Sequence, residues 1–448
     1  MNSKKSFSLV LAAMGLCVSL QSCVTKNDAQ LAPKGNTAVV NSPASSSSPE
    51  HSATPESPQA TESPQATETS STPQSSPSPE RSDRTLEMPQ KTVAEFDAKK
   101  SARFTDSAKF LAGMKVKDTP AIAKLTKSSA WNQYATSFDK AWANLETQQL
   151  SKVRTWSENE LTAINQTSKP IFYPFSGPDF LYAYSFFPNG SDYVLVGLEP
   201  VGNVPDLDRL PDAQVKTKLR QIYGSLNAIL GLSFFRTKAM KVDLDKQGVL
   251  PILYVFLART NNQILDVQYI RLDKDGTIQN QTNNNQDKSQ VPGVKISFVQ
   301  EGQSQPQTLY YFSTDLSDSG LQKTPGFNKF VKKMDAHATY LKAASYLMHE
   351  EKFSTIRNLI LSQSSDLLQD DSGIPVKYFN RSKWDLAFYG TYTKPIDLFS
   401  KQYQPDLRKI YTSDKKIKPL NFGIGYKYRV NQSNLMLAIA KDKPQSQP

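Results

Sequence analysis

The chain has 448 residues, of which 38% are hydrophobic, and its 53 basic and 42 acidic side chains give a net charge of +11. Its two cysteines both lie near the N-terminus, so disulfide scaffolds and cysteine-ligated metals are excluded from the rest of the chain. With three histidines in all, a histidine-rich metal site is not expected, and we predict no cofactor. The positive charge either serves solubility alone, through scattered Lys and Arg, or attracts an anionic glycan or lipid, and we expect no nucleic acid.

The N-terminal segment is typical of an exported lipoprotein. Two lysines at positions 4 and 5 precede an apolar run, residues 7–20, that is too short to span a membrane and fits a signal peptide. The sequence Leu-Gln-Ser-Cys at 20–23 resembles the lipobox of bacterial prolipoproteins, with the glutamine as its one departure. This resemblance implies removal of residues 1–22, acylation of Cys23 with palmitate or a similar chain, and anchoring in a membrane.

The segment from 23 to 90 is rich in Ser, Pro, Thr and Gln, and its hexapeptide Glu-Ser-Pro-Gln-Ala-Thr is repeated in tandem. It has too few apolar side chains to offset the entropy of ordering, so we predict a disordered tether. The valine after Cys23 lacks the aspartate-type signal for the inner membrane, which by resemblance favours the outer membrane, on its periplasmic or its surface side. We expect the globular domain at 91–441 and a disordered tail at 442–448.

Residues 91–168 are predicted to form a helical subregion, either part of this domain or a separate unit. Large apolar side chains recur at helical spacing and are expected to face the core. Ser128 or Ser129 is placed to cap the helix that carries most of them. The apolar stripe comprises Trp131, Ala135, Phe138, Trp142, Leu145, Val153 and Trp156.

Short strands and helices are expected in the middle of the chain. A strand at 171–175 leads into a Ser-Gly-Pro turn, Asp179 opens a helix, and a buried strand follows at 193–198. Residues 249–258 are apolar with a proline inside and are compatible with helix or strand. Before them, one periodic helix carries Val215, Leu219, Ile222, Leu226 and Ile229 on its inner face.

The second half is predicted to mix strands and helices without the regular spacing of βαβ units. A long amphipathic helix is expected at 327–362. Because helices come first and strands and helices are then interspersed, the pattern favours an α+β fold in one large domain. The strands predicted here are 264–272, 294–299, 308–312, 386–392, 421–429 and 435–439.

Two turns contain candidate catalytic groups. The first places Ser176 and Asp179 on an exposed corner, with Asp179 as a helix N-cap; its sequence does not match the Gly-x-Ser-x-Gly elbow of hydrolases. The second contains Asp370, Asp371 and Ser372. Its Asp-Ser-Gly is similar to the catalytic turn of aspartic proteases, but an aspartate stands where an apolar residue is required.

These turns have structural and catalytic interpretations. As plain turns they need no ligand. As a site, their carboxylates supply acid and base, and Ser176 or Ser372 with His349 supplies a triad assembled through space. His349 is otherwise a partly buried histidine of the long helix. If segments 172–184 and 369–376 meet at one place, the catalytic interpretation is favoured; if they lie apart, the turns are structural.

Three segments, 172–182, 369–375 and 421–426, resemble a family of uncharacterised bacterial envelope proteins, a likeness that implies no assigned activity. The sequence therefore predicts an envelope lipoprotein that binds or organises an envelope polymer, such as an anionic glycan, or a partner protein. One alternative is a hydrolase of an envelope glycan or peptide. The other is a carrier of lipid or lipopolysaccharide.

Overall fold

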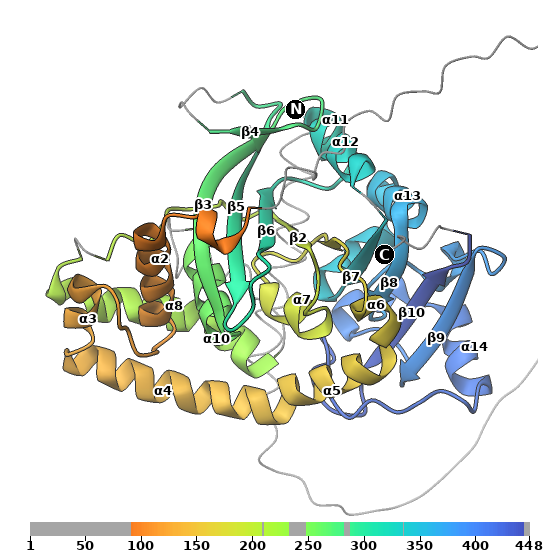
Figure 1. Ribbon diagram of the computed structural model, residues 1–448. Coiled ribbons are helices and arrows are strands. Elements are labelled where there is room, and N and C mark those ends of the chain that lie inside the picture. The colour runs from red at the N-terminus through yellow and green to blue at the C-terminus, as the bar shows by residue number, and fades with distance from the viewer. Residues whose placement is uncertain (1–90, 208–209, 233–247, 282–286, 335, 443–448) are drawn as a thin grey trace, which may run out of the picture. The chain divides into compact units, whose positions relative to one another are not determined.

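A ten-stranded mixed sheet runs through the part of the chain that the computed structural model describes, residues 91–207, 210–232, 248–281, 287–334 and 336–442 (Figure 1). The strand order is β4-β3-β5-β6-β2-β1-β7-β8-β10-β9. Cys23, the tether and residues 443–448 of the tail lie outside the described residues. The strands are β1 (Ile171–Tyr173), β2 (Asp192–Gly197), β3 (Asn262–Leu272), β4 (Ile278–Asn280), β5 (Val291–Gln300), β6 (Gln307–Ser313), β7 (His337–Leu341), β8 (Ser364–Gln369), β9 (Trp384–Gly390) and β10 (Asn434–Ala440).

The five central strands, β6-β2-β1-β7-β8, are parallel, and the strands that flank them pair antiparallel. The three-residue strand β1 pairs with β2 on one side, Phe172 opposite Val194, and with β7 on the other, Phe172 opposite Thr339. After β1, the chain forms all the strands on one side of it, β2 to β6, and then returns to place β7 on its other side. Strand β1 is therefore the point at which the direction of strand addition switches.

Two hydrophobic cores lie on the two faces of the sheet, because successive side chains of a strand point to opposite sides. Tyr173 belongs to the core formed with the N-terminal helices, and its neighbour Phe172 to the core formed with the later ones. The first set is α2 (Ala98–Leu111), α3 (Pro120–Leu125), α4 (Ser129–Leu145), α5 (Ser151–Glu160), α6 (Thr162–Asn165), α7 (Phe180–Phe186), α8 (Asp212–Leu232) and α10 (Leu250–Arg259). The second is α11 (Asp318–Lys323), α12 (Gly326–Lys333), α13 (Ser354–Gln363) and α14 (Pro405–Ser413).

Short helical turns complete the described part. One is a π-helical segment, η2 (Glu146–Leu150), which joins α4 to α5. The 3-10 turns are η1 (Val93–Glu95), η4 (Ala343–His349), η5 (Glu351–Phe353), η6 (Val376–Tyr378) and η7 (Asp397–Gln402). All described residues fall in one compact unit. Among them, no helix has the length and apolar character needed to cross a membrane.

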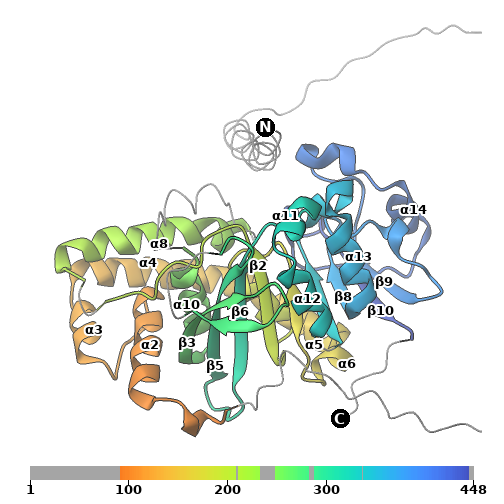
Figure 2. The same ribbon diagram turned by 90° about the horizontal axis from the view of Figure 1, so that it is seen from above.

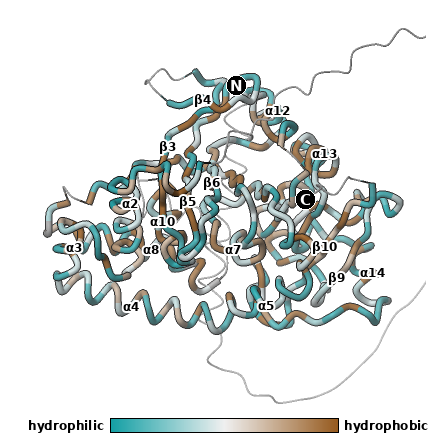
Figure 3. Tube along the Cα trace, viewed as in Figure 1, coloured by the Kyte–Doolittle hydropathy of each residue, from teal (hydrophilic) through white to brown (hydrophobic). Residues whose placement is uncertain are grey.

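The α+β fold class and the helical N-terminal part are confirmed. Every residue of the apolar stripe is buried. The Ser128 hydroxyl caps α4 by accepting from the Trp131 N–H at 3.2 Å. Helix α8 buries all five apolar side chains predicted for it and lies beside α4 (Figure 2). Residues 249–258 prove helical: Pro251 sits in the first turn of α10, a predominantly hydrophobic segment in Figure 3.

The predicted long helix at 327–362 is wrong. Helix α12 ends at Lys333, and Met334 has extended backbone angles. Residues 337–341, His-Ala-Thr-Tyr-Leu, form the central strand β7, in which every side chain is buried. Ala343 has a φ of +58°, which interrupts any continuous α-helix through this position. A strand buried on both faces has no polar alternation, so its apolar residues matched a helical spacing by coincidence.

The C-terminal strands are partly as predicted. Strands β9 and β10 confirm 386–392 and 435–439 within a few residues, whereas β8, at 364–369, was not predicted. The predicted strand at 421–429 is wrong: apart from one isolated bridge between Ile424 and Lys427, this segment is a loop. Two glycines turn the chain there, and Gly425 has a φ of +58°.

Candidate functional site

The two candidate turns meet at the carboxyl ends of the central parallel strands. Asp179 follows β1, Lys342 follows β7, and Asp370 and Asp371 follow β8. Since β1 is the switch point of the sheet, the loops after it and after its neighbour β7 flank the place where open sheets of parallel strands bind their ligands. We call Asp179, Lys342, Asp370 and Asp371 the carboxylate cluster. All four residues are buried.

Asp179 and Lys342 form a buried ion pair. The Lys342 Nζ lies 2.5 Å from Asp179 Oδ2, and both side chains are 2% exposed. The Tyr173 hydroxyl donates to the same carboxylate at 3.0 Å, and Lys342 Nζ lies 3.8 Å from the centroid of the Tyr182 ring. Burial raises the pKa of Asp179 and lowers that of Lys342, and the attraction between the two charges opposes both shifts.

The prediction for Asp179 is confirmed in one respect and wrong in another. Its Oδ1 accepts from the Tyr182 N–H at 3.2 Å, so Asp179 caps α7 as expected. The expected exposed corner is instead buried, because α7 itself is buried along its whole length. Ser176 is buried too, and its hydroxyl accepts from the Val196 N–H at 3.0 Å, which attaches the turn to β2.

Asp370 is a carboxyl group poised to exchange a proton near neutral pH. Burial, with the neighbouring Asp371 carboxylate, raises the pKa of Asp370 to about 7. Its Oδ1 accepts from both the backbone N–H, at 2.9 Å, and the hydroxyl of Ser372, and its Oδ2 accepts from the Ala343 N–H at 3.4 Å. Ser372, unlike Ser176, is thus paired with a carboxylate.

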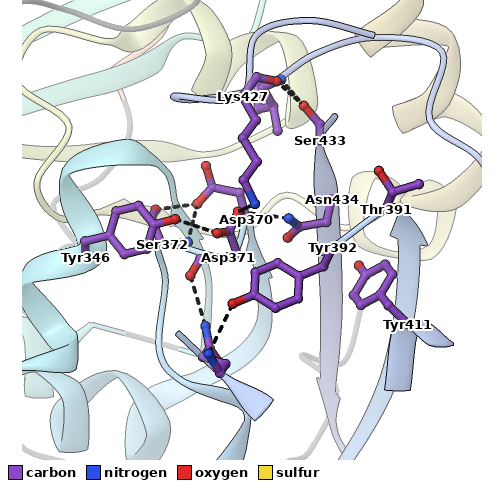
Figure 4. Close-up of polar contacts among 12 residues, drawn as sticks. Tyr346, Asp370, Asp371, Ser372, Thr391, Tyr392, Tyr411, Lys427, Ser433 and Asn434 are labelled. Atoms are coloured by element: carbon purple, nitrogen blue, oxygen red, sulfur yellow. Dashed lines mark hydrogen bonds and ion pairs between the residues drawn. The ribbon is translucent and has the colours of Figure 1, made fainter. Parts of the chain in front are cut away.

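Asp371 is surrounded by donors from three other segments (Figure 4). The Tyr346 hydroxyl donates to its Oδ2 at 2.5 Å, and the Asn434 amide donates to its Oδ1 at 2.8 Å. The Lys427 Nζ lies 2.9 Å from the same Oδ1. An acceptor with this many donors suits an ionised carboxylate.

Two polar atoms beside the cluster have no hydrogen-bond partner among the described residues. One is the Tyr340 hydroxyl, fully buried in β7, whose pKa is raised well above its usual range by burial and then by the charges of Asp179 and Asp370. The other is Nε2 of His349. Buried polar groups normally have partners, so each of these atoms is an unsatisfied hydrogen-bonding group next to the cluster.

His349 lies in η4 and not in the long helix expected for it. Burial lowers the pKa of His349 to about 4, against the opposing influence of Asp371, so the ring is neutral at pH 7. No group of three or more His, Cys, Asp or Glu side chains in the described part of the chain is arranged to hold a metal ion.

Aromatic rings lie beside the carboxylates. Tyr346, which donates to Asp371, stacks on Phe399 with ring centroids 4.4 Å apart, and Tyr426 lies 6.2 Å away with its ring nearly parallel. Tyr392 stacks on Tyr403, whose side chain is 46% exposed. Such rings form platforms for the apolar faces of sugars and for cations.

Sequence reasoning missed most partners of the carboxylates. Lys342 directly follows β7, which the long helix expected at 327–362 concealed, and its backbone N–H donates to the Ser345 hydroxyl at 3.2 Å. Lys427 and Asn434 gave no local signal, because each comes from a segment far along the chain. A lysine directly after a short apolar run was the one usable sign of Lys342.

Gly425 provides a direct test of how closely the cluster is covered. A Cβ at this position would overlap Asp370 Oδ2, and the residue has positive φ. We expect Gly425→Ala to lower the free energy of unfolding by about 2–4 kcal/mol, measured by urea denaturation. Gly302→Ala is the matched control, since Gly302 also has positive φ but open space around it; it should cost about 1 kcal/mol. Equal losses would show that Gly425 does not pack on Asp370.

No protein-family model matches this chain, and no curated protein sequence matches it. The comparisons therefore add no activity, substrate or partner to the geometry.

Proposed function

We propose that this domain is a hydrolase acting on a glycan or peptide polymer of the cell envelope, carried there as a lipoprotein. The observation that supports it is the convergence of Asp179, from the turn after β1, and Asp370 and Asp371, from the turn after β8, around Lys342 and its neighbours. Buried titratable groups with shifted pKa values, at the carboxyl ends of parallel strands beside a switch point, are typical of active sites.

The two adjacent aspartates supply the two proton transfers that hydrolysis needs. One group protonates the leaving oxygen or nitrogen, and the other takes a proton from the attacking water. In the proposed reaction Asp370, with its pKa of about 7, is the acid. Asp371 is the base, and exchange with solvent then returns both groups to their starting state. The ion pair of Lys342 and Asp179 positions the loops after β7 and β1 around them.

The test is release of soluble fragments from dye-labelled peptidoglycan sacculi by the full-length mature protein in detergent. We expect release by the wild type and a loss of at least about 100-fold in Asp370→Asn and Asp371→Asn. Asp385→Asn is the control, because the Asp385 side chain is 72% exposed and pairs with Lys441 at the sheet edge. Sacculi left intact by the wild type, or cut equally by Asp370→Asn, would contradict the proposal.

The lipoprotein part of the proposal is tested separately. Cells expressing the chain are fed a fatty-acid analogue that can be coupled to a dye. We expect the wild type to be labelled and to sediment with outer membranes, and Cys23→Ala to lose both properties, because the mature chain has no other cysteine. Label retained by Cys23→Ala would refute acylation at this residue.

A polymer-binding module without hydrolysis is the second candidate, and the aromatic rings favour it. Tyr346 and Phe399 are stacked next to Asp371, as in sites that hold sugar rings. In the same sacculus experiment this function predicts co-sedimentation of the protein without release of dye. Phe399→Ala should then weaken co-sedimentation while Asp370→Asn leaves it unchanged.

A further inference from the structure

Lys427 reaches into the carboxylate cluster from a loop, residues 421–433, that lies over it. Figure 4 shows its side chain extending from this loop toward Asp371 and Asn434. Its Nζ lies 2.9 Å from Asp371 Oδ1 and 4.7 Å from the centroid of the Tyr392 ring. The side chain is 12% exposed, so a nearly buried ammonium group occupies this place.

The loop is built to present Lys427 in this position. The Lys427 N–H donates to the Ile424 carbonyl and the Ile424 N–H donates to the Lys427 carbonyl, both at 3.1 Å, which closes a tight turn. The Ser433 hydroxyl donates to the Lys427 carbonyl and accepts from the Ile424 N–H at 2.7 Å. Gln149, in the π-helical segment between α4 and α5, donates to the Gly423 carbonyl. Withdrawal of the lysine therefore needs only a swing of its own flexible side chain.

The groups that surround this ammonium are those that recognise a ligand amine. A carboxylate supplies the opposite charge and an aromatic face supplies cation–π attraction, here Asp371 and Tyr392. The Tyr340 hydroxyl, which has no hydrogen-bond partner among the described residues, is a second buried polar group close enough to Asp370 to feel its charge. Tyr403, whose side chain is 46% exposed, stacks on Tyr392, the ring that Lys427 covers.

We propose that Lys427 is a built-in occupant of a site for a primary ammonium group, and that the polymer bound here carries free amines. This inference rests on the proposed function, because it names the substrate class of the same site. The ligand amine displaces Lys427 from Asp371 and Tyr392. Lys427 competes with the ligand and lowers its apparent affinity.

The test is calorimetric binding of two amine probes, a glucosamine tetramer and the peptide alanyl-lysyl-alanine, each beside its N-acetylated form. We expect Lys427→Ala to bind one free-amine probe about tenfold more tightly than the wild type does, because its internal competitor is gone. The acetylated forms should not bind. The probe that responds identifies the amine as that of a sugar or of a peptide. Lys441→Ala, which removes an exposed lysine paired with Asp385, should bind as the wild type does.

The inference is overturned if free and acetylated probes bind Lys427→Ala alike, or if Lys427→Ala binds the free amines no better than the wild type. Should Lys427→Ala fail to fold, the wild type and Asp371→Asn decide: selective binding of free amine by the wild type must be lost in Asp371→Asn. Dye release from sacculi is measured in parallel. Release without amine selectivity refutes this inference alone, and amine selectivity without release refutes the hydrolase alone.

Discussion

Lys342→Met is expected to lower the free energy of unfolding by about 3–5 kcal/mol, because it leaves Asp179 as an unpaired charge in the interior. Both partners are 2% exposed, so water cannot replace the lost ammonium group. The measurement is urea denaturation at pH 7. Lys100→Met is the matched control. Lys100 pairs with Asp266 and its side chain is half exposed, so loss of this ion pair should lower the free energy of unfolding by at most about 1 kcal/mol.

The double variant Asp179→Asn/Lys342→Met distinguishes an unpaired charge from lost packing. The asparagine keeps a side-chain oxygen to cap α7 through the Tyr182 N–H and carries no charge. We expect the double variant to recover at least half of the stability that Lys342→Met loses. If the losses of stability from the two substitutions are instead additive, Asp179 and Lys342 do not stabilise each other, and their ion pair does not hold the cluster together.

Asp370→Asn is expected to gain stability relative to the wild type as the pH rises. The pKa of Asp370 is about 7 in the folded protein and near its ordinary value of 3.8 in the unfolded chain. The folded state therefore holds this proton more tightly, and the stabilisation present at low pH is lost as the pH rises toward 7. Asparagine has no proton to lose. The advantage of Asp370→Asn should be about 2–3 kcal/mol larger at pH 8 than at pH 5.

Asp192→Asn is the matched control for this prediction. Burial raises the pKa of Asp192 to about 6, but this residue starts β2, at the opposite end of the parallel strands from the cluster. Its variant should show the same trend, at about 1 kcal/mol between pH 5 and pH 8, with dye release unchanged. An Asp370→Asn variant that is less stable than the wild type at pH 8 would show that the carboxylate serves structure and not chemistry.

Features with a local cause could be predicted from the sequence. The capping roles of Ser128 and Asp179 depend on residues three positions away, and the buried stripe of α4 depends on helical spacing. The two candidate turns were recognised because Asp, Ser, Gly and Pro favour such conformations. Their meeting could only be posed as a question, since it depends on the order of strands in the sheet.

Features that depend on the sheet could not be predicted. Strand β7 pairs parallel on both sides and is buried on both faces, and β8 begins with the polar run Ser-Ser-Asp, so neither shows the polar alternation that marks a half-buried strand. Because these strands were not predicted, Lys342 could not be recognised as the residue that follows β7, and His349 was assigned to a helix. The donors to Asp371 were likewise hidden, because Tyr346, Lys427 and Asn434 reach it from three separate segments.

The pH dependence of dye release from sacculi, for the wild type and Asp370→Asn, tests the central claim most directly. An acid with a pKa of about 7 must be protonated to act, so wild-type release should fall as the pH rises through about 7. Asp370→Asn should release at least about 100-fold less dye at pH 6 and show no such fall. Wild-type release that is flat from pH 6 to pH 8, or that Asp370→Asn reproduces, would contradict an acid role for Asp370.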